Sequence, residues 1–167
     1  MKELDEVEKK IISVLENVVD FYYKSEDQDK DKRSWWTANV KDGFCKLAAD
    51  MNYLVTANGC NAYENREWLF DMVWTEPNFE ELILAMECGW DRNDGIWRDF
   101  EKLLVVRSKY RIFIFNSSKS EEIKELMKEF IEKIKKFKST LPEDRYLLAG
   151  YSFKEGFIFD GIPIIPN

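Results

Sequence analysis

The sequence predicts a single mixed α/β domain in which helices cover an open β-sheet. Segments with apolar side chains every three to four residues alternate along the chain with short, nearly continuous apolar runs. The first pattern is typical of amphipathic helices, and the second is typical of strands buried on both faces. The chain has 167 residues, of which 45% are hydrophobic and 15% aromatic. This length and composition predict one domain that spans residues 1–167.

The N-terminal part predicts two helices joined by a polar segment. Apolar side chains recur at helical spacing throughout residues 1–24, which predicts an N-terminal helix. Residues 25–34, SEDQDKDKRS, contain no apolar side chain and predict a linker between this helix and the main body. A second, shorter helix is expected over 43–51, with Asp42 and Gly43 at its start.

Three strands are expected next. The segment YLVTA, residues 53–57, is rich in β-forming residues and ends at an Asn-Gly turn signal. Residues 67–75 and 81–88 are nearly continuous apolar runs, and the connection between them contains a proline and an asparagine that suit a turn. Both runs predict strands that are buried on both faces of a sheet.

Helical spacing returns over residues 95–108, and the apolar strand pattern returns over 109–116. The clearest helix of the chain is expected over 118–138, because acidic residues lie in its first turn and lysines lie near its end. One or two further strands complete the C-terminal region 118–167. The predicted order is helix, linker, helix, three strands, helix, strand, helix and strands.

The residues that the chain lacks exclude several kinds of chemistry. There is no histidine, so imidazole catalysis, Ser-His-Asp machinery and the common zinc sites are excluded. The three cysteines, Cys45, Cys60 and Cys88, form no C-x-x-C pair. Each is expected to be a small buried hydrophobic residue in a reducing compartment. No glycine-rich phosphate-binding motif is present.

The chain is expected to be cytoplasmic and not to enter a membrane. Its longest apolar runs are far shorter than the roughly 20 residues that cross a bilayer. The first ten residues, MKELDEVEKK, are charged where a signal peptide would be apolar.

Two carboxylates lie inside the apolar runs. Asp71 is in the middle of WLFDMVW, and Glu87 is near the end of LILAMEC. If residue 76 pairs with residue 82 in an antiparallel hairpin, Asp71 lies opposite Glu87 on the same face of the sheet. Two carboxylates at that separation repel each other unless a cation lies between them. The pairing therefore predicts a site for Mg²⁺ or Mn²⁺ rather than for zinc.

A structural alternative exists for these two carboxylates. Residues 60–101 carry eleven acidic and three basic side chains, and most of these acidic groups are expected to be solvated on loops and helix surfaces. Asp71 and Glu87 would then cap a loop or form ion pairs with an arginine such as Arg66 or Arg111.

The arrangement of these residues resembles the PD-(D/E)XK nuclease superfamily, whose members have a restriction-endonuclease-like fold. The resemblance covers residues 43–116 and rests on a buried Asp, a hairpin, a Glu at the end of the next strand, a helix and a further strand. It implies an α-β-β-β-α-β core with flanking helices. It also implies that Asp71, Glu87 and the backbone carbonyl of Cys88 bind Mg²⁺ or Mn²⁺, and that the chain hydrolyses phosphodiester bonds of DNA or RNA.

The sequence departs from the family at the catalytic lysine. The family motif places a lysine two residues after the glutamate, but the sequence there reads Glu87-Cys88-Gly89. Some members carry the lysine on the following helix, which makes Lys102 the candidate for the catalytic lysine. The alternative for Lys102 is a surface lysine that pairs with a helical Asp or Glu.

The acidic balance also favours an alternative function. The net charge of −7 and the pI of 4.9 provide no basic surface over the whole domain for nucleic acid. The alternative is a catalytically inactive nuclease-fold protein that acts as a binding or assembly module, with a homodimer formed through the first helix or the terminal strands.

The tryptophans are assigned mainly to the core. Trp68, Trp74 and Trp97 fit inward-facing positions in their predicted elements. Trp35 and Trp36 follow the polar segment and are expected either to close over the sheet or to form a partner surface.

Overall fold

The structure is a computed structural model that describes residues 4–60, 62–90 and 94–162. Within these ranges the chain forms four helices and six strands in a mixed α/β arrangement, which confirms the predicted fold class. The helices are α1 (Glu6–Lys24), α2 (Arg33–Asp50), α3 (Asp94–Val105) and α4 (Ser120–Lys136). The strands are β1 (Leu54–Ala57), β2 (Met72–Thr75), β3 (Leu82–Gly89), β4 (Tyr110–Asn116), β5 (Arg145–Ser152) and β6 (Gly156–Ile162).

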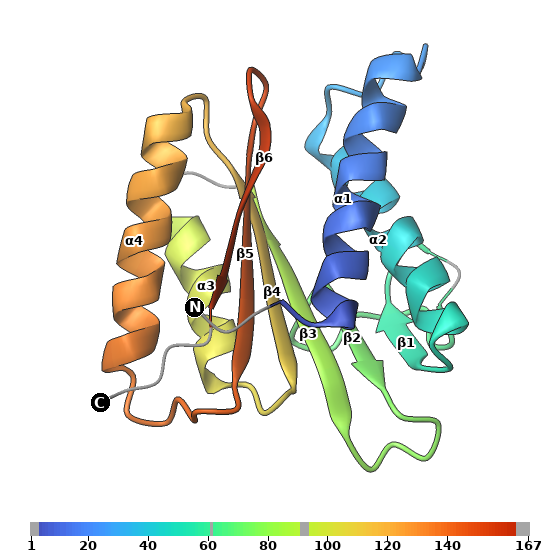
Figure 1. The fold of residues 1–167 in the computed structure, drawn as a ribbon. Coiled ribbons are helices and arrows are strands. Elements are labelled where there is room, and N and C mark those ends of the chain that lie inside the picture. Colours follow the sequence, from blue (N-terminus) through green and yellow to red (C-terminus); the bar gives the residue numbers. More distant parts are fainter. Residues whose placement is uncertain (1–3, 61, 91–93, 163–167) are drawn as a thin grey trace.

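One sheet contains all six strands in their sequence order. Strands β1, β2 and β3 form an antiparallel meander, and β5 and β6 form an antiparallel hairpin. The pairs β3–β4 and β4–β5 are parallel, and α3 and α4 are the crossover helices that connect them. Figure 1 shows three layers, with α3 and α4 on one face of the sheet and α1 and α2 on the other.

Each face of the sheet has its own hydrophobic core. On the face covered by α1 and α2, Ile11 and Phe44 pack with the strand residues Trp74 and Met86. On the face covered by α3 and α4, a group of aromatic rings, Phe100, Phe113, Phe115 and Phe130, fills the space between the helices and the sheet. The described residues contain no helix that is long and apolar enough to cross a membrane.

Helix α1 forms as predicted and is part of this layered structure. Asp5 caps it, because its side chain accepts hydrogen bonds from the N–H groups of Val7 and Glu8. Helix α1 packs against α2, and Ile11 and Leu15 have no exposed surface. The polar segment that was predicted as a linker is therefore a short connection between two helices of the same layer. Residues 1–3 and 163–167, at the ends of the predicted terminal regions, lie outside the described residues.

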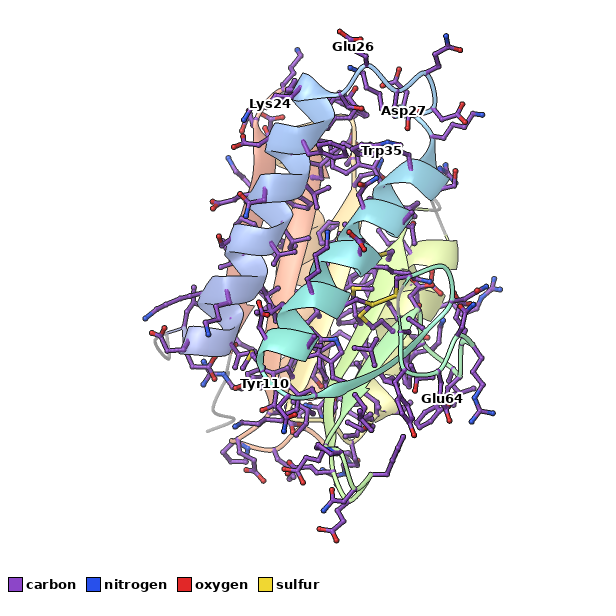
Figure 2. All side chains as sticks on the ribbon, turned by 90° about the vertical axis from the view of Figure 1, so that its right-hand side faces the viewer. Lys24, Glu26, Asp27, Trp35, Glu64 and Tyr110 are labelled. Atoms are coloured by element: carbon purple, nitrogen blue, oxygen red, sulfur yellow. A yellow bond between two sulfur atoms is a disulfide. The ribbon has the colours of Figure 1, made fainter. Side chains whose placement is uncertain are left out.

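Helix α2 begins ten residues earlier than predicted, at Arg33 instead of residue 43. The sequence suggested a helix start at Gly43, but this glycine lies inside the helix and faces α1. A Cβ atom at position 43 would lie 2.6 Å from Cγ1 of Val14. Glycine is therefore needed for the close approach of the two helices rather than for a helix end. Trp35 and Trp36 lie in the first turns of α2 and are buried. Trp35, which is labelled in Figure 2, stacks on Phe21 of α1, and Trp36 packs against Tyr151 of β5.

Strand β2 is shorter than predicted. The sequence predicted a strand over 67–75, but the strand begins at Met72, so Asp71 lies one residue before the strand and not in its middle. Trp68 was assigned to the core, and this assignment is wrong, because Trp68 is exposed. The apolar run is split instead between an exposed Trp68-Leu69 pair and the buried Phe70.

The predicted register between β2 and β3 holds over most of the hairpin. Met72 pairs with Met86 and Trp74 pairs with Leu84, which is the register that places position 71 opposite Glu87. A bulge between Trp74 and Thr75 shifts the register at the turn, so that Thr75 and not residue 76 pairs with Leu82.

One of the three cysteines is as predicted, and the other two are not. Cys88 is a free, buried thiol, as expected. Cys45 of α2 and Cys60 of the loop after β1 are joined in a disulfide, so these two are not the isolated hydrophobic residues that the sequence suggested (Figure 2).

Candidate metal centre

Asp71 lies at the entrance to β2 and is bound to the backbone of the neighbouring strand. The N–H group of Cys88 donates a hydrogen bond of 2.7 Å to Oδ2 of Asp71. Because the register between the strands pairs Met72 with Met86, position 71 faces position 87 across the hairpin. Opposed residues of antiparallel strands have Cβ atoms about 4.5–5.5 Å apart. The two carboxylates that the sequence singled out are therefore neighbours.

Glu87 lies in β3, on the face of the sheet that α3 covers. Its side chain is 3% exposed, and Oε1 accepts a hydrogen bond of 2.8 Å from Nζ of Lys102. The same ammonium group contacts Oδ1 of Asp99 at 3.2 Å and the carbonyl oxygen of Leu69 at 3.5 Å. The geometry thus brings together Asp71, Glu87 and Lys102, the three predicted catalytic residues. The role predicted for the Cys88 carbonyl stays a prediction.

Each of the two carboxylates keeps one oxygen atom that receives no hydrogen bond from any described residue. These atoms are Oδ1 of Asp71 and Oε2 of Glu87, whereas the other oxygen of each group is bound to Cys88 N–H or to Lys102. Neither oxygen is among the fully buried polar atoms of the described residues that lack a partner, so both can be reached from outside the protein. The unbound oxygens are therefore available to a ligand.

The electrostatic environment disfavours the ionised form of both carboxylates. Burial raises the pKa of Glu87 to about 8, and the nearby charge of Asp71 also raises it, although the hydrogen bond from Lys102 acts in the opposite direction. Burial likewise raises the pKa of Asp71 above its ordinary value, against the hydrogen bond from Cys88 and the charge of Lys41. A cation bound between the two groups would offset both effects.

Lys41 is a residue of this region that the prediction did not assign to the site. Its side chain is only 5% exposed, and Nζ binds Oε1 of Glu67 at 2.7 Å and the carbonyl oxygen of Asn58 at 3.3 Å. Lys41 lies three residues before the core residue Phe44 on the same helix, so helical periodicity would have placed it facing inward. That signal is visible only if α2 is predicted to begin before position 41.

Among the described residues neither carboxylate pairs with Arg66 or Arg111, the arginines named for the structural alternative, although Asp71 does bind a backbone N–H group. Arg66 pairs with Glu64 at 2.9 Å, and the buried Arg111 pairs with Asp144 at 3.0 Å, so both arginines bind other carboxylates. The cation that binds Glu87 is Lys102.

Position 89, where the resemblance would place a lysine, has little room for a side chain. A Cβ atom at position 89 would lie 2.8 Å from Cζ of Phe113 and 3.3 Å from Cγ1 of Ile96. Both contacts are with the packed core beneath α3, so a long side chain at this position would displace it. Lys102 reaches Glu87 from α3 instead.

The charge of the site suits a divalent cation. Four carboxylates, Glu67, Asp71, Glu87 and Asp99, lie with two lysines, Lys41 and Lys102, which gives a formal charge of −2. No group of three or more acidic or cysteine side chains that could hold a metal ion occurs within residues 4–60, 62–90 and 94–162. An ion at this site would therefore have two carboxylate ligands, and water or phosphate oxygens would complete its shell, as is common for Mg²⁺.

Comparisons with protein-family models, with curated proteins and with solved structures find no match for this chain. The fold and the geometry of the site therefore carry the functional inference.

Proposed function

We propose that this chain is a metal-dependent nuclease that hydrolyses phosphodiester bonds of DNA or RNA. One observation carries the proposal: Lys102, from a different element of the fold, binds Glu87 beside Asp71, and each of these carboxylates retains an oxygen that accepts no hydrogen bond from a described residue. An acidic pair can hold a cation, and an adjacent lysine can stabilise negative charge on a phosphate, so together these groups suit metal-assisted hydrolysis.

The arrangement of the elements also supports this function. The order α2, β1, β2, β3, α3 and β4 is the order of helices and strands that the resemblance to PD-(D/E)XK nucleases implies. The carboxylates lie at the β2–β3 hairpin, and the lysine lies on the helix that follows it. This placement is compatible with a catalytic lysine that has moved from the strand to the helix.

Within such a site, each residue has a distinct task. A bound Mg²⁺ or Mn²⁺ would polarise the phosphate and lower the pKa of a bound water. Asp71 Oδ1 and Glu87 Oε2 would hold the ion, and the N–H group of Cys88 fixes the orientation of Asp71. Burial acts to lower the pKa of Lys102, but its contacts with Glu87 and Asp99 outweigh this effect and raise that pKa. Lys102 is therefore an ammonium group at neutral pH, suited to stabilise negative charge on the phosphate rather than to accept a proton.

The experiment that tests this function is a cleavage assay. Plasmid DNA and a mixed-sequence RNA are incubated with the protein and Mn²⁺ or Mg²⁺, and the wild type is compared with Asp71→Asn. The control is Asp29→Asn, which removes one negative charge from an exposed aspartate that pairs with Lys32 in the α1–α2 connection. We expect cleavage by the wild type and by the control, and at least a 100-fold loss with Asp71→Asn.

Cleavage that persists in Asp71→Asn would show a contaminating nuclease and would contradict the proposal. Metal binding by the wild type without cleavage of either substrate would instead favour the inactive binding module.

A further inference from the structure

The loop that leads into the candidate site exposes large apolar side chains although it is firmly held. A bridge between Thr56 and Glu64 ties it to β1, and Lys41 binds its residue Glu67. Lys102 contacts the carbonyl oxygen of Leu69, and the next residue, Phe70, is buried in the core under α3. The loop conformation is thus fixed on both sides of Trp68.

Trp68 and Leu69 nevertheless point away from the core. Trp68 is 44% exposed and Leu69 is 77% exposed, in a chain where Trp35, Trp36 and Trp74 are buried. Phe70 already anchors this segment to the core, so its fold does not require two further apolar side chains at the surface. Exposed apolar side chains on a fixed loop are typical of a contact surface.

This surface is adjacent to the candidate metal centre. Leu69 lies two residues before Asp71, and its carbonyl oxygen contacts the same ammonium group that binds Glu87. A molecule that contacts Trp68 and Leu69 is therefore placed beside the two carboxylates.

The charges around the site indicate what kind of nucleic acid fits. Proteins that bind a duplex neutralise many phosphates with free lysines and arginines. Three cations that belong to the loop or contact it, Lys41, Arg66 and Lys102, are instead paired with carboxylates. Stacking of a base on an aromatic ring contributes about 1–3 kcal/mol per base, and it requires an unpaired base.

We propose that Trp68, together with Leu69, is a stacking surface for an unpaired base, and that the site takes single-stranded nucleic acid in preference to duplex. This inference rests on the proposed nuclease function, whose site it extends. Tyr63, which is also exposed and lies 6.1 Å from the ring of Phe79, offers a second aromatic face on the same loop.

The test is a binding measurement by fluorescence anisotropy, with Ca²⁺ in place of Mn²⁺. The probes are oligothymidylate and oligouridylate of about 15 nucleotides and a DNA duplex of the same length. The variants are Trp68→Ala and the conservative Trp68→Phe. The matched control is Phe153→Ala, because Phe153 is 50% exposed in the turn between β5 and β6.

We expect the wild type to bind a single strand more tightly than the duplex. Trp68→Ala should weaken that binding by about 5- to 100-fold, Trp68→Phe should restore most of it, and Phe153→Ala should leave it unchanged. Equal binding by the wild type and Trp68→Ala, tighter binding of the duplex, or no binding of any probe would overturn the inference.

A cleavage assay on the same variants separates this inference from the proposed function. Mn²⁺-dependent cleavage that is unchanged in Trp68→Ala on single-stranded and duplex substrates would leave the nuclease function standing and remove the stacking surface. Binding that depends on Trp68, without cleavage by the wild type, would keep the surface and remove the nuclease function.

Discussion

Two clusters of buried and half-buried carboxylates differ in how completely their oxygen atoms are bound. In the α1 cluster, formed by Asp5, Glu8, Tyr110 and Arg145, every carboxylate oxygen accepts a hydrogen bond. The backbone N–H groups of Val7 and Glu8 and the Tyr110 hydroxyl bind Asp5. Arg145 and the N–H group of Asp5 bind Glu8. Tyr110 is labelled in Figure 2.

The site cluster, formed by Asp71, Glu87 and Lys102, leaves one oxygen of each carboxylate without a donor among the described residues. The carboxylate pKa values of the two clusters shift in opposite directions. Burial acts to raise the pKa of Asp5, but the Tyr110 hydrogen bond, the backbone N–H groups and the charge of Arg145 outweigh it and lower that pKa. At the site, burial dominates and raises the pKa of both carboxylates. The α1 cluster thus has a donor for every carboxylate oxygen, whereas the site cluster keeps two carboxylate oxygens without a donor among the described residues.

The largest expected effect comes from breaking the α1 cluster. Arg145→Met leaves Glu8, which is almost fully buried, without its cation. We expect the free energy of unfolding to fall by about 3–5 kcal/mol, measured by urea denaturation at pH 7. A loss below about 1 kcal/mol would mean that the cluster is as weakly coupled as a surface ion pair.

Removal of the cation from the site cluster should reduce catalysis. Lys102→Met is expected to reduce the cleavage rate by about 100- to 1000-fold, because a positive group beside the phosphate is lost. Mn²⁺ affinity should stay the same or increase, since Lys102 no longer competes for Glu87. Lys133→Met, which removes an exposed lysine paired with Glu101, is the control. Equal rates for Lys102→Met and Lys133→Met would assign Lys102 a surface role only.

The two clusters should also respond to pH with opposite signs. The folded pKa of Glu87 is about 8 and the ordinary value is 4.5, so the folded state retains the proton to higher pH and stability falls as pH rises between these values. Asp5, with its lowered pKa, contributes stability above its ordinary value of 3.8 that is lost as pH falls.

Glu87→Gln should therefore raise the free energy of unfolding by up to about 3 kcal/mol at pH 7 and flatten its decline between pH 5 and 8. Glu132→Gln, at an exposed position of α4, is the control and should keep the wild-type slope. A wild-type stability that rises over this pH range would contradict the environment assigned to Glu87.

The smallest expected effect is on stability and comes from a side chain added at position 89. Gly89→Ala places a methyl group against Phe113 and is expected to destabilise the domain by about 1–3 kcal/mol in thermal or urea unfolding. An unchanged stability would mean that position 89 has room for a side chain, and that packing is not the reason why the lysine lies on α3.

The sequence predicted the parts of the fold and the site that depend on local pattern. The periodicity of α1 and α4 and the apolar runs of β3 and β4 identify these elements, and the spacing of Asp71 and Glu87 around the hairpin gave their register. The features that the sequence did not predict, such as the start of α2 and the exposure of Trp68, depend on packing between elements. Gly43 suggests a helix start in the sequence, but in the structure it lies inside α2 and permits close contact between α1 and α2. Trp68 extends an apolar run, yet only Phe70 of that run turns into the core.

The central claim is that Asp71 and Glu87 together bind a divalent cation, and calorimetric titration of Mn²⁺ at pH 7.5 tests it most directly. We expect the wild type and Asp29→Asn to bind one ion per chain with the same affinity, and Asp71→Asn and Glu87→Gln each to lose at least tenfold. Binding by the wild type that survives both substitutions, or no binding by the wild type at all, would contradict the claim.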